Sequence, residues 1–210
     1  MKKKILVCGL NFSPEIVGIA KYTTELVDWL YKKNADIRII SACPYFPKWE
    51  TKRNRYSKES KNKKYTIYRC PIYLPKKITG FSRILHLSSF LISSLPVVIS
   101  QYFWKPQIII TVVPSFFSTQ NSLLLNFLMQ GKTTNIVHYQ DLEIDAAFQM
   151  GILKNKFLKK LLYEWEKKTI SKFDYVSTIS RKMLKKILEK NLNPSKTIYL
   201  PNWVDTSEIF

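Results

Sequence analysis

Apolar residues follow two alternating patterns along the chain, short continuous runs and helical repeats. Residues 5–10 form a continuous apolar run, which is typical of a strand covered on both faces of a sheet. Over residues 19–30 the apolar positions recur at the spacing of one helix face, and Asn34 follows as a helix stop. Residues 37–40 are a second apolar run. A strand, a helix and a strand in this order predict a βαβ unit with parallel strands.

The same alternation continues to the end of the chain. Further strands are predicted at residues 65–70, 107–113, 135–139, 175–179 and 197–200, and helices at 116–129, 153–172 and 181–190. About seven strands alternate with helices, so the predicted fold class is α/β, a doubly wound, Rossmann-like parallel sheet. We expect this domain to span residues 1–200, and residues 201–210 to be an extended segment that leads out of it.

One long apolar segment is compatible with three environments. Residues 84–104 contain no Asp, Glu, Lys or Arg, and about 20 apolar residues suffice to span a bilayer. Serines, His86 and Pro96 interrupt the segment. The sequence leaves open a core helix, a helix that lies in the membrane interface, and a bilayer span.

The chain is strongly basic. Its 34 Lys and Arg against 15 Asp and Glu give a net charge of +19, which indicates an anionic partner such as a phosphorylated substrate, anionic lipid or nucleic acid. Basic residues concentrate in residues 48–64, which we expect to be an exposed loop. They are Lys48, Lys52, Arg53, Arg55, Lys58, Lys61, Lys63 and Lys64. No helix-turn-helix, finger or RNP pattern appears, so nucleic-acid binding is the weaker alternative.

Three cysteines, Cys8, Cys43 and Cys70, stand far apart and show no metal-binding spacing. We interpret them as reduced and structural, which suits the cytoplasm.

Ligands of open parallel sheets bind beyond the carboxyl ends of the strands, so the loops after the predicted strands hold the candidate site. In the first loop, Gly18 permits either close approach of the backbone to a ligand or merely the turn. The helix that follows favours an anion at its N-terminus, and Lys21 adds positive charge. The loop lacks the glycine pattern of dinucleotide-binding proteins, so the signal is weak.

The loop over residues 138–145 holds the richest chemistry. It contains His138, Asp141, Glu143 and Asp145, and a histidine with carboxylates can move protons or bind sugar hydroxyls. We expect the His138 ring to point into the crevice, with the acidic loop orienting it and raising its basicity. The alternative is a structural histidine, with Asp145 capping the next helix. No second His or Cys lies nearby, so no metal is expected here.

Two other loops are weaker candidates. Ser115, after the strand at residues 107–113, is best explained as a helix N-cap. Arg181, at the start of a later helix, is equally consistent with a phosphate contact and with a solvated side chain.

Four segments carry a family likeness in a fixed order: NFSPEIVGIAKYTTELVDWL, SACPYFPKW, HYQDLEIDAAFQMGIL and LPNWVD. Together they resemble glycosyltransferase family four, and among its members the colanic-acid-type enzymes of bacterial exopolysaccharide synthesis. The resemblance runs along nearly the whole chain. It implies a GT-B fold, in which two Rossmann-like domains face a cleft, and it identifies this chain with the N-terminal, acceptor-binding domain.

The resemblance also implies a function. Such enzymes transfer a sugar with retention from a nucleotide sugar, the co-substrate, to a lipid-linked or glycan acceptor, and they need no metal or other cofactor. By this likeness Gly18 would lie against the sugar diphosphate, His138 and Asp141 would line the cleft, and Asn202 would lead toward the donor domain. We take His138 and Asp141 as the candidate catalytic residues. The further candidates for substrate binding are Lys21, Glu143, Asp145 and Arg181.

The chain also departs from the family pattern. Many members carry a glycine pair where Gly18 is followed by Ile19, and the donor domain with its Glu-x7-Glu segment is missing. We therefore expect the chain alone to be inactive, and a non-catalytic sugar- or lipid-binding module is the alternative. Residues 48–64 and 84–104 predict peripheral attachment to the anionic cytoplasmic face of the plasma membrane. Nucleic acid is not an expected partner.

Overall fold

A computed structural model describes residues 2–16, 18–61, 64–77, 79–149, 151 and 155–204. The described strands are β1 Lys4–Gly9, β2 Asp36–Ala42, β3 Ser57–Lys61, β4 Tyr65–Cys70, β5 Ile108–Val113, β6 Thr134–Tyr139, β7 Tyr175–Thr178 and β8 Thr197–Tyr199. The described helices are α1 Ile19–Lys32, α2 Gly80–Ser100, α3 Thr119–Leu128, α4 Glu143–Gln149, α5 Lys156–Ile170 and α6 Arg181–Leu188, with short 3-10 turns at Phe116–Ser118 and Pro194–Lys196.

The strands form a single sheet in the order β3-β4-β2-β1-β5-β6-β7-β8. All neighbours are parallel except β3 and β4, and Ile5 of β1 is level with Ile37 of β2 and Ile108 of β5. The predicted βαβ unit and the doubly wound α/β fold class are therefore confirmed. The chain winds outward from β1 in one direction and from β5 in the other, which makes the β1–β5 boundary the topological switch point.

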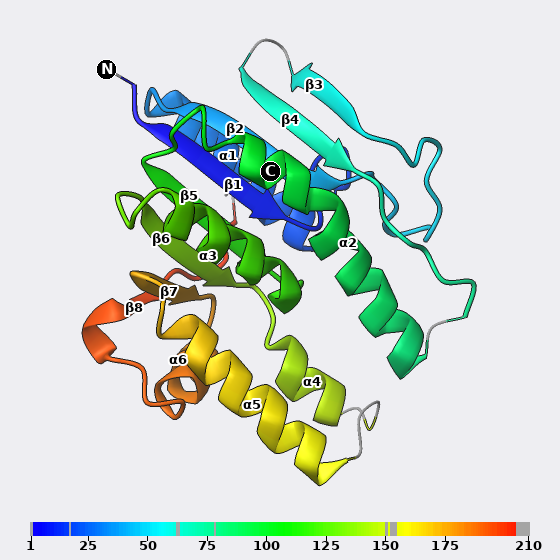
Figure 1. Cartoon of the computed structure of the whole chain (residues 1–210), viewed down its shortest axis with the longest axis vertical. Helices are drawn as coiled ribbons and strands as arrows, with labels where there is room; N and C mark the ends of the chain where they lie inside the picture. The colour runs from blue at the N-terminus through cyan, green and yellow to red at the C-terminus, as the bar shows by residue number, and fades with distance from the viewer. Residues whose placement is uncertain are drawn as a thin grey trace.

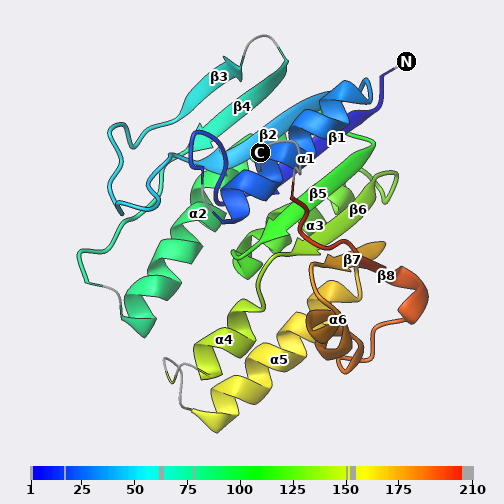
Figure 2. The ribbon, with the colours of Figure 1, turned by 180° about the vertical axis from the view of Figure 1, so that it is seen from behind.

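Helices cover both faces of the sheet (Figures 1 and 2). Helices α2 and α3 lie in front of it in Figure 1, and α1 lies on the opposite face, toward the viewer in Figure 2. Leu6 packs in the cluster that includes Leu87 and Phe90 of α2, whereas Val7 packs in the cluster that includes Val27 of α1. Because successive side chains of β1 are buried on opposite faces, the strand reads as a continuous apolar run.

Helix α2 buries one face and exposes the other. Its buried residues are His86, Leu87, Phe90, Ser94 and Val98, and it contacts β2, β4 and α3. The helix is long and apolar enough to cross a bilayer by length and composition, and 28% of that window is buried inside the fold. The core-helix interpretation of residues 84–104 is thus right for the inner face. The outer face still exposes Phe81, Leu85, Ile92 and Ile99.

The basic segment is not only a loop, as the sequence suggested. Ser57–Lys61 is an edge strand, β3, which pairs antiparallel with β4. The sequence of this strand, SKESK, has no apolar residues and so no alternating pattern that predicts a strand. Lysine and glutamate side chains are typical of edge strands. The described side chains Lys48, Lys52, Arg53, Arg55, Lys58 and Lys64 are exposed, as expected. Residues 62 and 63 and the side chain of Lys61 lie outside the described part of the chain.

Helix α4 also escaped the sequence analysis, and α5 starts at Lys156, with residues 152–154 outside the described residues. After β8, residues 201–204 run back to α1. There the Trp203 indole Nε1 donates to Glu25 Oε2 at 2.7 Å, and the ring meets Tyr22 edge-on at 5.7 Å. Residues 205–210 lie outside the described residues, and the domain boundary at residue 200 stays a prediction.

Candidate active site

A cavity of about 290 Å³, here called the central pocket, lies at the carboxyl ends of the strands. Residues that follow β1, β2, β5 and β6 contribute to it, together with the first turn of α1 and part of α2. Its lining residues are Leu10, Asn11, Gly18, Ile19, Ala20, Tyr45, Phe46, Trp49, Arg83, His86, Leu87, Pro114, Asp141 and Glu143. The pocket therefore occupies the switch point, where doubly wound sheets bind their ligands.

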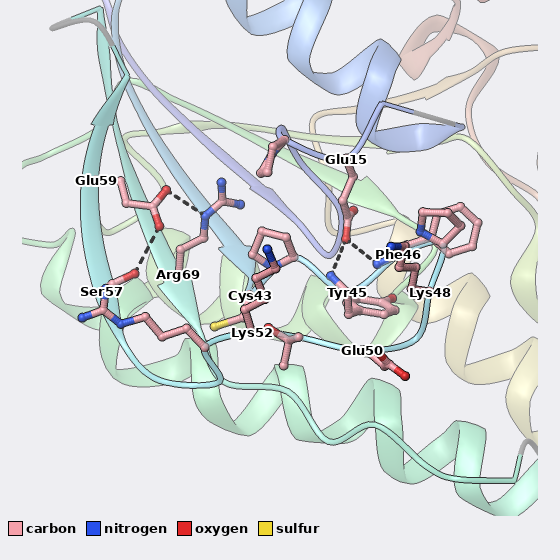
Figure 3. A pocket seen from close by; sticks show the side chains of 15 residues that line it. Glu15, Cys43, Tyr45, Phe46, Lys48, Glu50, Lys52, Ser57, Glu59 and Arg69 are labelled. Atoms are coloured by element: carbon pink, nitrogen blue, oxygen red, sulfur yellow. Dashed lines mark hydrogen bonds and ion pairs between the residues drawn. The ribbon is translucent and has the colours of Figure 1, made fainter.

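Glu15 ties two of the walls together. One oxygen of its buried carboxylate accepts hydrogen bonds from the backbone N–H groups of Tyr45 and Phe46, at 2.8 and 2.9 Å (Figure 3). The other oxygen accepts a hydrogen bond from the Asn11 amide at 2.9 Å. The loop after β1 and the segment after β2 are thus held in one arrangement, which fixes Asn11 and Tyr45 in the pocket wall.

Gly18 shapes the start of α1. Its φ of 58° and ψ of −134° suit glycine, while a Cβ there would meet nothing within 4 Å. Gly18, Ile19 and Ala20 line the central pocket, and the N-terminus of a helix favours an anion. Lys21, the predicted neighbour, instead lies outside the lining and pairs with Glu25 at 3.8 Å on the same helix.

Arg83 and Glu143 form the charged side of the pocket. The Arg83 guanidinium, 40% exposed, lies 3.9 Å from Glu143 Oε1. Glu143 Oε2 accepts a hydrogen bond from the Phe116 N–H at 3.2 Å, whereas Oε1 is buried and has no hydrogen-bond partner. Burial raises the pKa of the Glu143 carboxyl from 4.5 to about 7, against the opposing effects of Phe116 and Arg83. Glu143 can therefore both donate and accept a hydrogen bond near neutral pH.

His86 supplies a neutral imidazole. Its Nδ1 lies 2.6 Å from the Tyr73 carbonyl oxygen, and its Nε2 lies 3.2 Å from the Tyr45 hydroxyl. A carbonyl oxygen only accepts, so Nδ1 carries the proton and Nε2 accepts from Tyr45. Burial lowers the pKa of His86, which favours the uncharged ring. The ring packs edge-on against Tyr45 and tilted against Trp49, with both ring centroids 5.1 Å away, and the three rings form an aromatic wall.

His138 has surroundings quite different from those expected. It is only 3% exposed, does not line the central pocket, and is hydrogen-bonded through Nδ1 to Ser177 Oγ and through Nε2 to the Gln140 amide at 2.8 Å. No carboxylate of the described chain is among these partners. The expectation that the acidic loop orients His138 and raises its basicity is therefore wrong. Burial lowers the pKa of His138 to about 4, so the ring is neutral.

The acidic residues of the same loop separate. Asp141 is exposed and, like Glu143, lines the central pocket. Asp145 points elsewhere, to the Tyr163 hydroxyl and to Lys186 and Lys190 at 3.4 and 3.5 Å. Asp145 thus belongs to a buried ion network and not to the pocket.

The remaining candidates lie apart from the pocket. The Arg181 guanidinium rests on the Tyr199 ring, 5.6 Å from its centroid. Asn202 lies in the segment that returns to α1, with its buried Oδ1 unpaired. The structure thus brings together Gly18, Asp141 and Glu143, and it separates them from Lys21, His138, Asp145, Arg181 and Asn202.

A second cavity, the basic basin, adjoins the central pocket across Tyr45 and Phe46 (Figure 3). It has a volume of about 410 Å³. Arg69 forms its floor, and this buried guanidinium is fully engaged by Glu59 Oε2 at 3.2 Å, Ser41 Oγ at 2.7 Å and the Ser13 carbonyl. Exposed Lys48, Lys52 and Arg53 lie on the rim. The floor is structural, and the rim supplies exposed positive charge.

The cysteines are free and buried, as predicted. Among the described residues, no group of three His, Cys, Asp or Glu is placed to hold a metal ion.

Comparison with known proteins gives the pocket its context. A protein of Escherichia coli (strain K12), "Putative colanic acid biosynthesis glycosyl transferase WcaI", is 40% identical over 207 residues, which are 95% of this chain and 50% of that protein. The chain is thus similar over nearly its whole length to this putative glycosyl transferase. It spans about half the length of this relative.

A solved structure shares the fold of this chain. The catalytic domain of starch synthase IV from Arabidopsis thaliana, bound to ADP and acarbose, superposes with a TM-score of 0.65 at 11% identity. The match covers 99% of this chain and 53% of that one, and it shows a shared fold. No protein-family model matches the chain.

Several residues in and around the central pocket of this chain were not predicted from the sequence. Arg83 and His86 sit at one end of a segment that we interpreted only by its lack of charge. Asn11 and Glu15 share the loop of Gly18, so the rule of strand ends already covered them. Tyr45 follows the strand at residues 37–40, and the same rule could have found it.

Proposed function

We propose that the chain is the N-terminal, acceptor-binding half of a glycosyltransferase that moves a sugar from a nucleotide sugar to a lipid-linked or glycan acceptor. The observation that carries the proposal is the central pocket, which lies at the switch point and presents Asn11, Arg83, Asp141 and Glu143. The 40% identity to the colanic acid protein supports sugar transfer as the chemistry.

The pocket is suited to a sugar. The Asp141 carboxylate and the Asn11 amide can bind sugar hydroxyls, which both donate and accept hydrogen bonds. Glu143, with a pKa of about 7, can take either role, and its Oε1 makes no hydrogen bond, with only the Arg83 guanidinium nearby at 3.9 Å. Tyr45 and Trp49 offer apolar ring surface beside these groups. An acceptor hydroxyl would thus be held by fixed groups before transfer.

The donor side needs a second domain. We expect the nucleotide sugar to be held mainly by that domain, with its diphosphate approaching Gly18 and the first N–H groups of α1. Arg83 and the helix terminus supply positive charge where another enzyme would use a metal ion, so no metal is proposed. In this arrangement the chain alone binds acceptor without turnover, and transfer proceeds with retention of configuration.

The enzyme is proposed to work at the cytoplasmic face of the plasma membrane. Exposed basic residues of the segment 48–64 and the apolar outer face of α2 support peripheral attachment. Each basic residue near an anionic surface contributes about 1 kcal/mol. Sedimentation with anionic liposomes should therefore fall at high salt and vanish with neutral lipid, and binding indifferent to lipid charge would count against attachment.

A chimaera tests the catalytic proposal. The chain is joined to the part of the E. coli relative that it does not match, and release of nucleoside diphosphate from a panel of nucleotide sugars is measured with bacterial lipid extract as acceptor. We expect release with the chimaera and none with the chain alone. Arg83→Gln and Asp141→Asn should lower turnover by roughly 100-fold or more, as losing one transition-state contact does.

Matched controls are Lys21→Gln and Arg181→Gln, which change charge outside the pocket. Sugar or lipid binding by a folded chimaera without any transfer would indicate the non-catalytic module instead.

A further inference from the structure

A third cavity, the apolar groove, opens between α2 and α5. It has a volume of about 240 Å³ and is lined by Gly80, Arg83, Ile84, Leu87, Phe116, Phe117, Glu143, Ile144, Leu158, Leu162 and Trp165. Arg83, Leu87 and Glu143 also line the central pocket, so the two cavities adjoin at these residues. The charged lining residues of the groove, Arg83 and Glu143, lie at this junction.

The base of the groove is packed, with Leu87, Phe116 and Ile144 buried, whereas other apolar side chains of its walls stay partly exposed. Trp165 packs edge-on against Phe116 with ring centroids 4.7 Å apart, and it also contacts Phe117 at 5.5 Å. Ile84 and Leu158 are only half-buried between these rings and solvent. Apolar surface that stays open to water beside a polar pocket is characteristic of a ligand-binding groove.

We propose that the apolar groove holds the hydrocarbon chain of a lipid-linked acceptor, whose phosphate lies at Arg83 and whose sugar enters the central pocket. The inference rests on the proposed function and narrows its acceptor to the lipid-linked class. An amphiphile of this kind matches the order of the surfaces: apolar groove, guanidinium, then the hydroxyl-binding groups Asp141 and Asn11. The guanidinium is 40% exposed and therefore accessible to a phosphate.

A single chain in the groove differs from contact with a bilayer. The groove is a hollow between residues of α2, α5 and the segment 116–117, whereas Ile92, 69% exposed, lies on the outer face of α2. Ile84 and Ile92 are the same residue type on the same helix, eight positions apart, but they face different surroundings. Substituting each in turn separates binding of one lipid chain from adsorption to a surface.

The test uses the 210-residue chain and farnesyl diphosphate, a water-soluble isoprenoid diphosphate, below its micelle-forming concentration. Isothermal titration calorimetry should show binding at least tenfold tighter than that of farnesol or of inorganic diphosphate, because each of these lacks one half of the ligand. Ile84→Asn and, independently, Leu158→Asn should weaken binding at least tenfold. Arg83→Gln should weaken it several-fold and leave farnesol binding unchanged.

Ile92→Asn is the matched control and should bind farnesyl diphosphate as the wild type does. Circular dichroism melting checks that each variant is folded. The two groove substitutions lie on different helices, so the result still stands if one of the two variants misfolds. Equal loss in the Ile84 and Ile92 variants, or no binding by the wild type, overturns the groove.

The two proposals can fail separately. Transfer by the chimaera to a lipid-linked acceptor, unaffected by Ile84→Asn and by Leu158→Asn, would keep the transferase and reject the groove. Farnesyl diphosphate binding by the chain, with no transfer by the chimaera to any acceptor, would keep the groove and reject the transferase.

Discussion

Glu143 and Asp145 lie two positions apart on α4, and the structure gives them opposite surroundings. Residues two apart on a helix point roughly 200° from one another. Glu143 lines the central pocket with one carboxylate oxygen that makes no hydrogen bond, and burial raises the pKa of this carboxyl. Asp145 faces α5 and α6. There burial acts to raise the pKa of Asp145. The hydrogen bond from Tyr163 and the positive charges of Lys190 and Lys186 together outweigh burial, so the pKa is lowered.

The difference shows how to tell a ligand-facing carboxylate from a structural one. Asp145 belongs to a connected network: Lys190 also binds Glu166, and Glu166 accepts from the Tyr139 hydroxyl at 3.0 Å. Around Glu143, the buried Oε1 makes no hydrogen bond, and the Arg83 guanidinium at 3.9 Å is half-exposed. A buried carboxylate that lacks hydrogen bonds marks the pocket. The mere presence of acidic residues in the sequence does not.

The largest expected effect comes from opening the Asp145 network. Lys190→Met removes the cation that two buried carboxylates share, and loss of one partner from a buried ion pair costs about 3–5 kcal/mol of unfolding free energy. Urea denaturation measures it. Lys186→Met is the matched control, since Lys186 pairs with the same Asp145 from a more exposed position and should cost at most about 1 kcal/mol. Equal losses would show that the network is not buried as a unit.

The pH dependence of stability should separate the two carboxylates next. The folded protein holds the Glu143 proton more tightly than the unfolded chain, with a pKa of about 7 against 4.5. This contribution is full below pH 4.5 and is lost as the pH rises through 7. Between these values the stability difference between wild type and Glu143→Gln should change by about 3 kcal/mol.

Asp145→Asn is the control for that experiment. The pKa of Asp145 is lowered in the folded protein, so its contribution is present above pH 3.8 and is lost only as the pH falls further. Its difference from wild type should stay constant from pH 4.5 to 7. Parallel behaviour of the two variants would contradict their opposite placement.

His138→Ala extends the comparison to the histidines. The substitution leaves Ser177 and Gln140 without a buried partner, and we expect unfolding free energy to fall by about 2 kcal/mol. The sequence also predicts that turnover falls roughly 100-fold, as on loss of a transition-state donor. Turnover per folded chimaera tests this, with His86→Ala, inside the pocket, for comparison. Unchanged turnover would remove His138 from the catalytic residues.

The smallest effect concerns two glycines with positive φ. Gly18→Ala and Gly131→Ala each force alanine into a left-handed backbone, without a steric contact, at a cost of about 1 kcal/mol. Only Gly18 lines the central pocket. Gly18→Ala alone should therefore weaken binding of the nucleotide sugar by the chimaera, and an equal loss with Gly131→Ala would assign the effect to stability.

Sequence patterns predicted most of the fold because burial on both faces leaves a readable mark. The strands at residues 5–10 and 37–40 are continuous apolar runs and appear as β1 and β2. Strand β3 was missed because its pairing comes from backbone hydrogen bonds to β4, which leave no trace in a charged edge sequence. Helix α4 was missed because it is short and begins inside the acidic loop.

The site was harder to predict, since it depends on which way each side chain turns. Position at a strand end correctly placed Gly18, Asp141 and Glu143 around one pocket. The same rule misplaced His138, because the pleat of β6 turns this ring toward Ser177 of the adjacent strand, level with it in register. Arg83 comes from a helix that crosses the strand ends, and only the tertiary packing of α2 brings it there.

The two ends of the sheet differ in how they resist aggregation. An open edge is a template on which another chain can add a strand, and charged side chains oppose this. At one edge, β3 presents the sequence SKESK, so an approaching strand would have to bury lysine and glutamate. At the other edge, β8 carries no charge over Thr197–Tyr199 and exposes Ile198 and Tyr199. Its three residues offer few backbone groups for pairing, so brevity protects this edge as charge protects the first.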